Sequence, residues 1–332
     1  MKKLLLTAAL AMTMPAVAGA TEIVIYTGGG AGSDGSGSTY HEGIGQGVAE
    51  FLEDGIADEL GYDVRLVPSN GAVDNANKVG ATTDRIVLGI GQGGLTYDAV
   101  EAGDTQIVRR DLPGECAMAF TAEPRIQSWG DIIANASRVT WVVPENSGSE
   151  AFIRKMYEAD DNFPGTPTFS YQNDSASIIA TVGNPSNRGT VGFFYAYPNP
   201  TSGLVNMAAE EDLSIFGVLS PAVAETDEAY YLNRKAPYQL SWFGFGETKT
   251  TRAMCSKALL FANDISGITD SWNRADAEMI LEAIESAPAE AFVPQGGPLA
   301  RVMSSVEDLS EEYGVNEMVS DLEAQVQGAL DR

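Results

Sequence analysis

The residue types that build metal centres and covalent cross-links are almost absent from this chain. Its 332 residues include two cysteines, Cys116 and Cys255, and a single histidine, His41. A metal site is not expected, because metal centres such as those of zinc are built mainly from clustered histidine, cysteine and acidic ligands. A serine hydrolase also lacks support, since no Gly-x-Ser-x-Gly motif occurs and His41 is the sole candidate base.

Basic residues are scarce as well. Twenty lysines and arginines stand against 46 aspartates and glutamates, which gives a formal net charge of −26 at pH 7. Nucleic-acid binding requires a basic footprint, so this composition argues against it and also disfavours an anionic membrane surface. The acidic excess favours solubility and is compatible with a salty habitat, where screening reduces self-repulsion.

Long hydrophobic runs are also missing. No stretch beyond the N-terminal segment reaches the roughly 18 consecutive apolar residues that a membrane-spanning helix needs. Residues 1–20 combine Lys2 and Lys3, a short apolar stretch and an A-x-A site at residues 18–20, which is typical of a cleavable secretory signal. We expect a soluble, exported chain that begins at Thr21 and, with no cysteine there, carries no lipid anchor.

The expected export affects whether the two cysteines form a disulfide. In an oxidising compartment the pair Cys116 and Cys255 indicates one disulfide, and two buried free thiols are the alternative. The length predicts two domains by the soft prior of about 150 residues per domain. A hydrophobic content of 44% indicates that both are folded.

Apolar β-rich runs alternate with helical patterns, which is typical of α/β layering. In the first part we expect strands at residues 23–27, 63–67 and 86–90 and a helix near 39–52. A further helix follows Ser69-Asn70-Gly71, with Ser69 or Asn70 as its cap. This order predicts a parallel βαβαβ unit. The remaining expected strands are 116–121, 139–143, 169–171, 190–195, 214–218 and 254–262, with helices at 150–157, 204–210 and 275–286.

A loop rich in glycine and serine, residues 28–39, lies between the first strand and the first helix. Glycines let backbone N–H groups approach an oxyanion closely, and a helix N-terminus adds unpaired donors and a positive dipole end. Gly30-x-Gly32-x-x-Gly35 also matches the dinucleotide fingerprint. That interpretation fails for two reasons. The second strand ends in Pro-Ser-Asn where an acidic residue should bind the ribose, and an exported protein is separated from the dinucleotide cofactors of the cell. We expect an anion-binding loop, no cofactor and no enzyme.

Several short motifs occur in a family-like order. They are Ser36-Gly37-Ser38-Thr39-Tyr40 with the following Gly43-Ile44-Gly45-Gln46-Gly47, then Ser69-Asn70-Gly71-Ala72-Val73-Asp74-Asn75, Leu88-Gly89-Ile90-Gly91-Gln92, residues 126–132 and residues 139–149. Together they cover most of residues 22–155 and resemble the TAXI-type solute receptors of TRAP transporters.

The resemblance implies a type II periplasmic binding protein fold, in which two α/β lobes are joined by two crossover strands. Lobe 1 would comprise residues 21–121 and 248–332, and lobe 2 residues 122–247. It implies a monomeric periplasmic receptor that delivers a small anionic solute, such as an amino acid or carboxylate, to the membrane subunits of a sodium-coupled TRAP transporter. The implied ligand contacts are Ser38, Thr39, Tyr40, Asn70, Gly71, Gln92, Ser147, Gly148 and Ser149.

In this fold the two crossovers run side by side, so a Cys116–Cys255 bond would join them behind the cleft. The first loop is longer than is usual in the family, and residues 230–247 have no counterpart that we can align.

A phosphate or other oxyanion receptor of an ABC-type transporter is the alternative function, since glycine- and serine-rich turns at helix N-termini suit any oxyanion. Aromatic residues favour a carbon skeleton; they are Phe193, Phe194, Tyr195, Tyr197, Trp242 and Phe243. Arg125 and Arg188 could pair with a second carboxylate, although a solvated surface role is the simpler interpretation.

Overall fold

The computed structural model describes residues 21–28, 40–102, 105–196, 203–226, 231–239 and 249–292. Residues 1–20 and most of the glycine-rich loop, including Ser38 and Thr39, lie outside the described residues, as do Tyr197, Trp242 and Phe243. No helix in these described ranges is long and apolar enough to cross a membrane.

The first half is built on three parallel strands. They are β1 (Thr21–Tyr26), β2 (Tyr62–Val67) and β3 (Val87–Gln92), in the order β2-β1-β3. The helices between and after them are η1 (Tyr40–Gly45), α1 (Gln46–Glu53), α2 (Ile56–Leu60), α3 (Ala72–Gly80) and α4 (Gly93–Ala102). The predicted parallel βαβαβ unit is confirmed.

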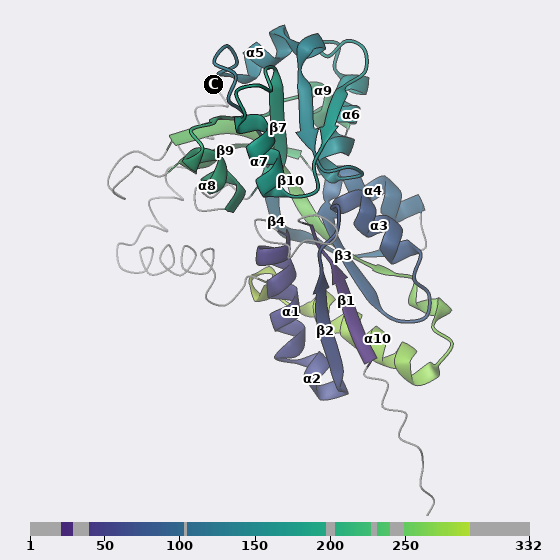
Figure 1. The fold of residues 1–332 in the computed structure, drawn as a ribbon. Helices are drawn as coiled ribbons and strands as arrows, with labels where there is room; N and C mark the ends of the chain where they lie inside the picture. The colour runs from purple at the N-terminus through teal and green to yellow at the C-terminus, as the bar shows by residue number, and fades with distance from the viewer. Residues whose placement is uncertain are drawn as a thin grey trace, which may run out of the picture.

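Two long strands connect this half to the second one (Figure 1). They are β4 (Thr105–Thr121) and β10 (Lys249–Asn263), which pair antiparallel with each other. β10 also pairs with β3 through residues 258–262, whereas β4 pairs through residues 116–121 with strands of the second half. Each long strand therefore belongs to both halves, as crossover strands do.

The second half continues the same sheet, whose order is β2-β1-β3-β10-β4-β7-β5-β6. Its parallel strands are β5 (Thr140–Val143), β6 (Thr168–Tyr171) and β7 (Thr190–Ala196). β8 (Ser214–Gly217) pairs with β4, and β9 (Tyr231–Gln239) pairs with β10. The helices are α5 (Trp129–Ala134), η2 (Ala136–Arg138), α6 (Gly148–Ala159), α7 (Ser175–Gly183), α8 (Gly203–Glu210) and α9 (Pro221–Thr226).

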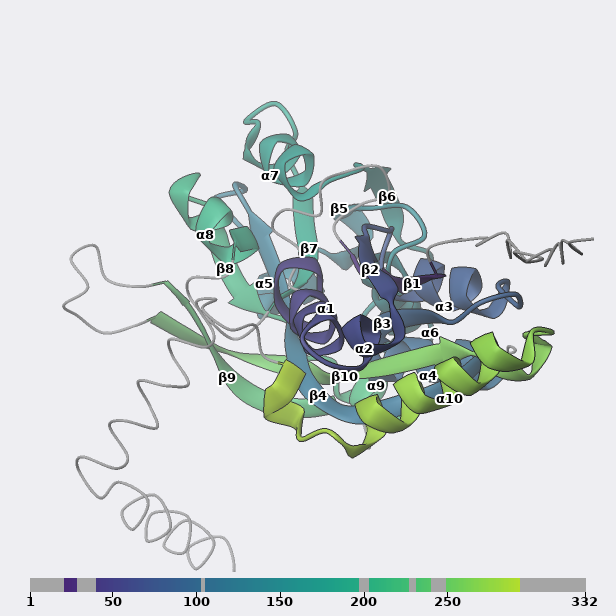
Figure 2. The same ribbon diagram turned by 90° about the horizontal axis from the view of Figure 1, so that it is seen from below.

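After β10 the chain returns to the first half through η3 (Ile265–Gly267), α10 (Ser271–Ser286) and η4 (Ala289–Phe292). Apolar side chains of α1, α2 and α10 pack with Ile23, Ile25 and Leu260 on one face of the sheet. Side chains of α3 and α4 cover the other face around Val24 and Phe261. Figure 2 shows α10 running along the long strands, with α1 and α2 nearby. The first half is thus a three-layer α/β unit.

The second half has its own core on both faces of its strands. Trp141, Phe152 and Phe193 belong to one cluster, and Phe120 and Ile178 belong to the other. Separate cores on either side of two crossover strands define two lobes, which confirms the predicted type II periplasmic binding protein architecture. The residue boundaries of the lobes given above stay a prediction.

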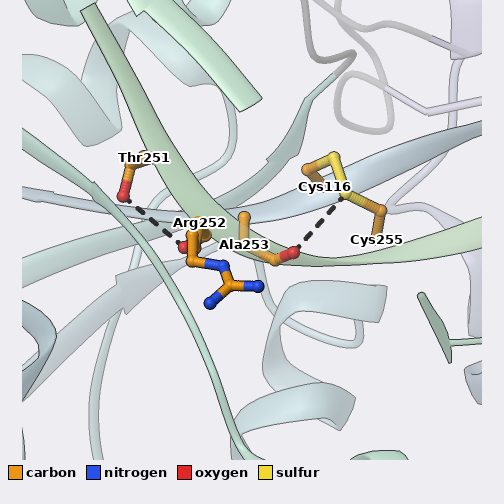
Figure 3. Close-up of a disulfide and its surroundings, with 5 residues drawn as sticks. All are labelled: Cys116, Thr251, Arg252, Ala253 and Cys255. Atoms are coloured by element: carbon orange, nitrogen blue, oxygen red, sulfur yellow. Dashed lines mark hydrogen bonds between the residues drawn. A yellow bond between two sulfur atoms is a disulfide. The ribbon is translucent and has the colours of Figure 1, made fainter. Parts of the chain in front are cut away.

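The disulfide joins the crossover strands (Figure 3). Cys116 of β4 lies directly opposite Cys255 of β10 in the strand pairing, and both side chains are buried. The Cys255 sulfur lies 3.7 Å from the carbonyl oxygen of Ala253, which is a contact and not a hydrogen bond, because a disulfide sulfur carries no proton. The disulfide prediction is therefore confirmed over the alternative of two free thiols.

Candidate ligand-binding site

A cavity of about 90 Å³ lies between the two lobes, where the carboxyl ends of the parallel strands meet. This volume has room for several water molecules or for a compact solute. The lining residues are Gly28, Tyr40, Asn70, Gly71, Ala72, Gln92, Glu115, Phe120, Pro144, Ser147, Gly148, Ser149, Asp174, Ser175, Ile178, Phe193, Phe194 and Tyr195.

A buried polar network positions the lobe 1 wall. The amide nitrogen of Asn75 donates to the carbonyl oxygens of Thr27 at 2.6 Å and Ile90 at 2.7 Å, at the ends of β1 and β3. The Ser69 hydroxyl lies within hydrogen-bond distance of Thr27 O and Asn75 Oδ1. Asn75 and Ser69 are fully buried, so both strand ends and the start of α3 are tied together beneath the cavity.

The turn into α3 differs from the prediction that Ser69 or Asn70 caps this helix. The N-cap is Gly71, with φ 106° and ψ −159°, and no side chain caps it. The Ser69 hydroxyl instead accepts from the N–H of Gly71 at 3.1 Å, and the N–H of Asn70 donates to Asp74 at 3.1 Å. The positive φ favours glycine at this position. The first-turn donors of α3 consequently face the cavity without a capping side chain in the way.

The opposite wall begins at α6. Ser147 is its N-cap: the hydroxyl accepts from the N–H of Glu150 at 3.1 Å and donates to the carbonyl of Pro144 at 2.7 Å. The Glu150 carboxylate accepts from the N–H of Asn146 at 2.7 Å, which gives a variant of the capping box. Because its hydroxyl is used in this turn, Ser147 shapes the loop, while Gly148 and Ser149 present first-turn N–H groups.

Arg154, the basic residue nearest this turn in sequence, is engaged elsewhere. Its guanidinium donates to Glu150 Oε1 at 2.6 Å, and this hydrogen bond raises the pKa of Arg154. Arg154 also lies over the ring of Phe169, 4.9 Å from the centroid. The side chain therefore supports the back of α6 and is not part of the cavity lining.

A third helix start, α7, also contributes to the cavity and was not predicted from the sequence. Asp174 is its N-cap and accepts from the N–H and the hydroxyl of Ser177, both at 2.8 Å. Asp174 and Ser175 line the cavity. The signal was an Asp-Ser-Ala-Ser cap directly after the strand at residues 168–171.

Helices α3, α6 and α7 have 9, 12 and 9 residues, and all three begin at this cavity. The first-turn N–H groups of a helix lack intrahelical acceptors, and each N-terminus carries the positive end of the helix dipole. Their convergence favours an anionic group such as a carboxylate.

Gln92 and Glu115, from β3 and β4, bring hydrogen-bond acceptors to the cavity. Gln92, at the end of β3, donates from its amide nitrogen to Glu115 Oε2 of β4 at 2.8 Å. Both side chains are buried, with exposed fractions of 6% and 3%. The other amide atom, Gln92 Oε1, is buried and has no hydrogen-bond partner among the described residues.

Aromatic side chains form the floor of the cavity. Phe120 and Phe194 lie with ring centroids 4.9 Å apart, and Phe193 stacks on Phe152 at 5.2 Å. Tyr195 packs edge-on against Phe193 at 5.4 Å. Phe120, Phe193, Phe194 and Tyr195 all line the cavity and provide an apolar surface for a carbon skeleton.

The lobes touch across the cavity. Lys155 of α6 donates to the carbonyl oxygen of Gly94 in α4 at 3.3 Å. A Cβ atom placed on Gly148 would lie 2.7 Å from Gln92 Oε1, and one placed on Gly71 would lie 3.5 Å from the nitrogen of Gly148. The structure is therefore a closed arrangement in which the starts of α3 and α6 meet.

Seven of the nine predicted ligand contacts line this one cavity: Tyr40, Asn70, Gly71, Gln92, Ser147, Gly148 and Ser149. Ser38 and Thr39 lie outside the described residues, so their role stays a prediction. Reasoning from the sequence missed Glu115 and Phe120 on β4 and the start of α7.

Other candidate residues lie elsewhere. Arg125 pairs with Glu123 at 2.8 Å, and Arg125 and Arg188 line a separate hollow. His41 Nδ1 lies 2.8 Å from the Thr27 hydroxyl and is not among the lining residues. In the part of the chain that the structure describes, no group of three or more potential ligands could hold a metal ion.

No protein-family model and no curated protein matches the chain. Among solved structures, it is similar to R. palustris Rpa4515 with adipate, at 13% identity over 91% of this chain and 96% of the other, with a TM-score of 0.47. MatC from Rhodopseudomonas palustris with bound malate has 12% identity over 88% and 97%, with a TM-score of 0.46. XAC2383 from Xanthomonas citri bound to ATP has 10% identity over 85% and 93%, with a TM-score of 0.44. Because a shared fold does not transfer a function, we base the proposed function on this chain's own residues.

Proposed function

We propose that this protein is an exported solute receptor that binds a small anionic solute, an amino acid or a carboxylate, between its two lobes. The observation that carries the proposal is the convergence of three helix N-termini from both lobes on one aromatic-floored cavity. The helix starts would bind the carboxylate, and the rings would contact the carbon skeleton.

A binding role fits the cavity better than a catalytic one. Nucleophilic catalysis needs a hydroxyl or thiol within hydrogen-bond reach of a base. Both cysteines form the disulfide, and His41 contacts Thr27 outside the lining. The Ser147 hydroxyl is used in its own turn.

A phosphate receptor is the second candidate, because the same helix starts suit any oxyanion. Two features of the described lining disfavour it. Glu115 and Asp174 bring carboxylates to the cavity, and this negative charge disfavours a phosphate dianion more than a singly charged carboxylate. The rings of Phe120, Phe193 and Phe194 also leave much of the wall unable to donate hydrogen bonds.

The resemblance of residues 22–155 to TAXI-type receptors supports the finer assignment. We place the protein in the periplasm as a monomer that delivers its solute to the membrane subunits of a sodium-coupled TRAP transporter. Contact between the lobes fits a receptor that closes on its solute, because differential contacts made only in the closed state would stabilise that state.

A thermal-shift screen of the mature protein tests the proposal. The panel should contain amino acids, dicarboxylates, keto acids and inorganic phosphate. A ligand that binds only the folded state at 100 times its Kd adds about 2.7 kcal/mol to the free energy of unfolding. A shift with at least one amino acid or carboxylate is expected. A shift with phosphate alone would favour the second candidate, and no shift with any member up to millimolar concentrations would contradict the receptor assignment.

A further inference from the structure

We infer that the solute carries a hydrogen-bond donor on the carbon atom next to its carboxylate, and that the side-chain oxygen of Gln92 accepts from this donor. The inference rests on the proposed function and narrows it from small carboxylates in general to 2-amino and 2-hydroxy acids. The observation behind it is a buried amide oxygen that has no partner among the described residues and lies against the start of α6.

The Gln92 amide is held in one orientation. Its nitrogen donates to Glu115 Oε2 at 2.8 Å, so the nitrogen faces β4 and the oxygen faces away from it. That oxygen lies against Gly148, because a Cβ atom placed on Gly148 would be 2.7 Å from Gln92 Oε1. Gln92 and Gly148 both line the cavity, so the oxygen belongs to the cavity wall where α6 begins.

This oxygen is costly to bury without a donor. Gln92 is 6% exposed, and its Oε1 has no hydrogen-bond partner in the part of the chain that the structure describes. A buried acceptor that is left unpaired costs its lost hydration, so such atoms in folded proteins are almost always paired. When the lobes close on a solute, the solute is the natural source of the donor, because Gln92 lines the cavity.

The carboxylate of the same solute would bind next to this oxygen. The N–H of Glu150 is already bonded to the Ser147 hydroxyl at 3.1 Å, so the donors that α6 presents are those of Gly148 and Ser149. The positive end of the helix dipole favours a negative group at these donors. Because Gln92 Oε1 lies against Gly148, the donors for a carboxylate and the acceptor for a second group are side by side.

Neighbouring donors and acceptor select a solute by the position of its substituent. An amine or hydroxyl on carbon 2 is attached next to the carboxylate, so it can reach Gln92 Oε1 while the carboxylate accepts from the start of α6. A 2-keto acid presents an acceptor at the same position, and an unsubstituted acid presents only C–H groups there. Sites built to hydrogen-bond an N–H or O–H of a substrate reject analogues that lack it, because polar groups of the site are then left unpaired.

Sets of acids that share one carbon skeleton test this in the unmodified protein. The three-carbon set is L-alanine, L-lactate, pyruvate and propionate, and the five-carbon set is L-glutamate, L-2-hydroxyglutarate, 2-oxoglutarate and glutarate. A third set is built in the same way on the skeleton of the acid that gives the largest shift in the thermal-shift screen. By calorimetry we expect the amino or hydroxy acid of at least one set to bind more than about tenfold more tightly than the keto and unsubstituted acids of that set. A smaller difference in every set that binds would overturn the inference.

Isomers test the position of the donor. β-Alanine and 3-hydroxypropionate, or 3-aminoglutarate and 3-hydroxyglutarate, carry the same donors one carbon further from a carboxylate. We expect them to bind at least about tenfold more weakly than the 2-isomers of the set that binds. Equal or tighter binding of the 3-isomers would overturn the placement of the donor beside Gly148.

A substitution tests the role of Gln92 itself. Gln92→Met keeps the length of the side chain and removes the acceptor, so the preference for the donor-bearing acid should fall at least about tenfold. Gln127→Met makes the same change at an exposed position outside the cavity lining and should leave the preference unchanged. If Gln92→Met does not fold, the acid sets still decide the inference. An unchanged preference in folded Gln92→Met would contradict it.

Failure of this inference can be told apart from failure of the proposed function. Binding of keto or unsubstituted acids as tightly as their amino and hydroxy analogues would overturn the inference and leave the receptor in place. Failure of every acid in the screen and in the sets to bind would overturn both.

Discussion

Gly148→Ala should reduce solute affinity without reducing the stability of the free protein. Gly148 is the first residue of α6, and an added Cβ would lie 2.7 Å from Gln92 Oε1 and 3.4 Å from the Cβ of Ala72. Gln92 and Ala72 belong to lobe 1, whereas Gly148 belongs to lobe 2. The clash therefore occurs only when the lobes are closed.

The size of the effect follows from that geometry. Ordinary contact begins near 3.4 Å, so Gln92 or the lobes must move by about 0.7 Å. Gln92 cannot easily swing away, because its amide nitrogen is bonded to the buried Glu115. Overpacking of this kind costs about 1 to 3 kcal/mol, which corresponds to a loss of affinity of about 5- to 150-fold.

Calorimetry with the solute identified by the screen, together with thermal unfolding of the free protein, measures both quantities. Gly130→Ala is the matched control, since Gly130 also lies in the first turn of a helix, α5, and its added Cβ would meet only Ser128 Oγ at 3.6 Å. We expect the control to bind like the unmodified protein. Unchanged affinity in Gly148→Ala, or a loss of stability without solute, would refute the proposed closure.

Four further changes test the framework around the cavity. Replacing both Cys116 and Cys255 with alanine should lower the melting temperature. The chain-entropy model for a separation of 139 residues sets an upper bound of about 5 kcal/mol on the loss in free energy of unfolding. Calorimetry should show retained binding, because neither residue lines the cavity. Asn75→Ala should lower the free energy of unfolding in urea by about 2 to 4 kcal/mol, because two buried carbonyls at the ends of β1 and β3 lose their donor. It should also weaken solute binding. A loss of stability with unchanged binding would show that the network does not position the site. The Arg109 guanidinium donates to the carbonyls of Ile284 and Ala287 at the end of α10, so Arg109→Met should destabilise the protein by about 2 to 3 kcal/mol. The hydrogen bond from Arg109 also lowers the pKa of Asp111 in the folded protein. The stability that the Asp111 carboxylate contributes is therefore present above the unfolded pKa of 3.8 and is lost as the pH falls through the lower folded pKa. In urea unfolding below about pH 4, Asp111→Asn should make the free energy of unfolding depend less on pH.

Most of the sheet could be predicted because its strands are short apolar runs between turn residues. β1, β2, β3, β5 and β7 all lie where the hydrophobic pattern places them. The first half of β4 could not be predicted in this way, since residues 105–115 include two arginines, an aspartate, a glutamate and a proline. That segment is a strand because it pairs with β10, and such long-range pairing leaves no local signal.

α7 was missed for a related reason. Residues 175–183 include Ile178, Ile179, Thr181 and Val182, whose branched side chains favour strands. The Asp174 cap and packing of Ile178 and Ile179 on the second lobe outweigh that preference.

The candidate site was predictable where it depends on local sequence and hidden where it depends on topology. Glycine- and serine-rich turns after strands revealed Asn70, Gly71 and the residues at 147–149. Gln92 and Glu115 are 23 residues apart and meet only because β3 and β4 both flank β10. The sequence shows neither that neighbourhood nor the burial that makes the pair informative.

Closure of the two lobes around a solute is the central claim, and small-angle X-ray scattering of the protein tests it most directly. Profiles should be recorded without solute and at a concentration that calorimetry shows to be saturating. We predict a smaller radius of gyration with solute, and a profile in agreement with the closed arrangement in which α3 and α6 meet. Identical profiles in the two conditions, at proven saturation, would contradict the claim.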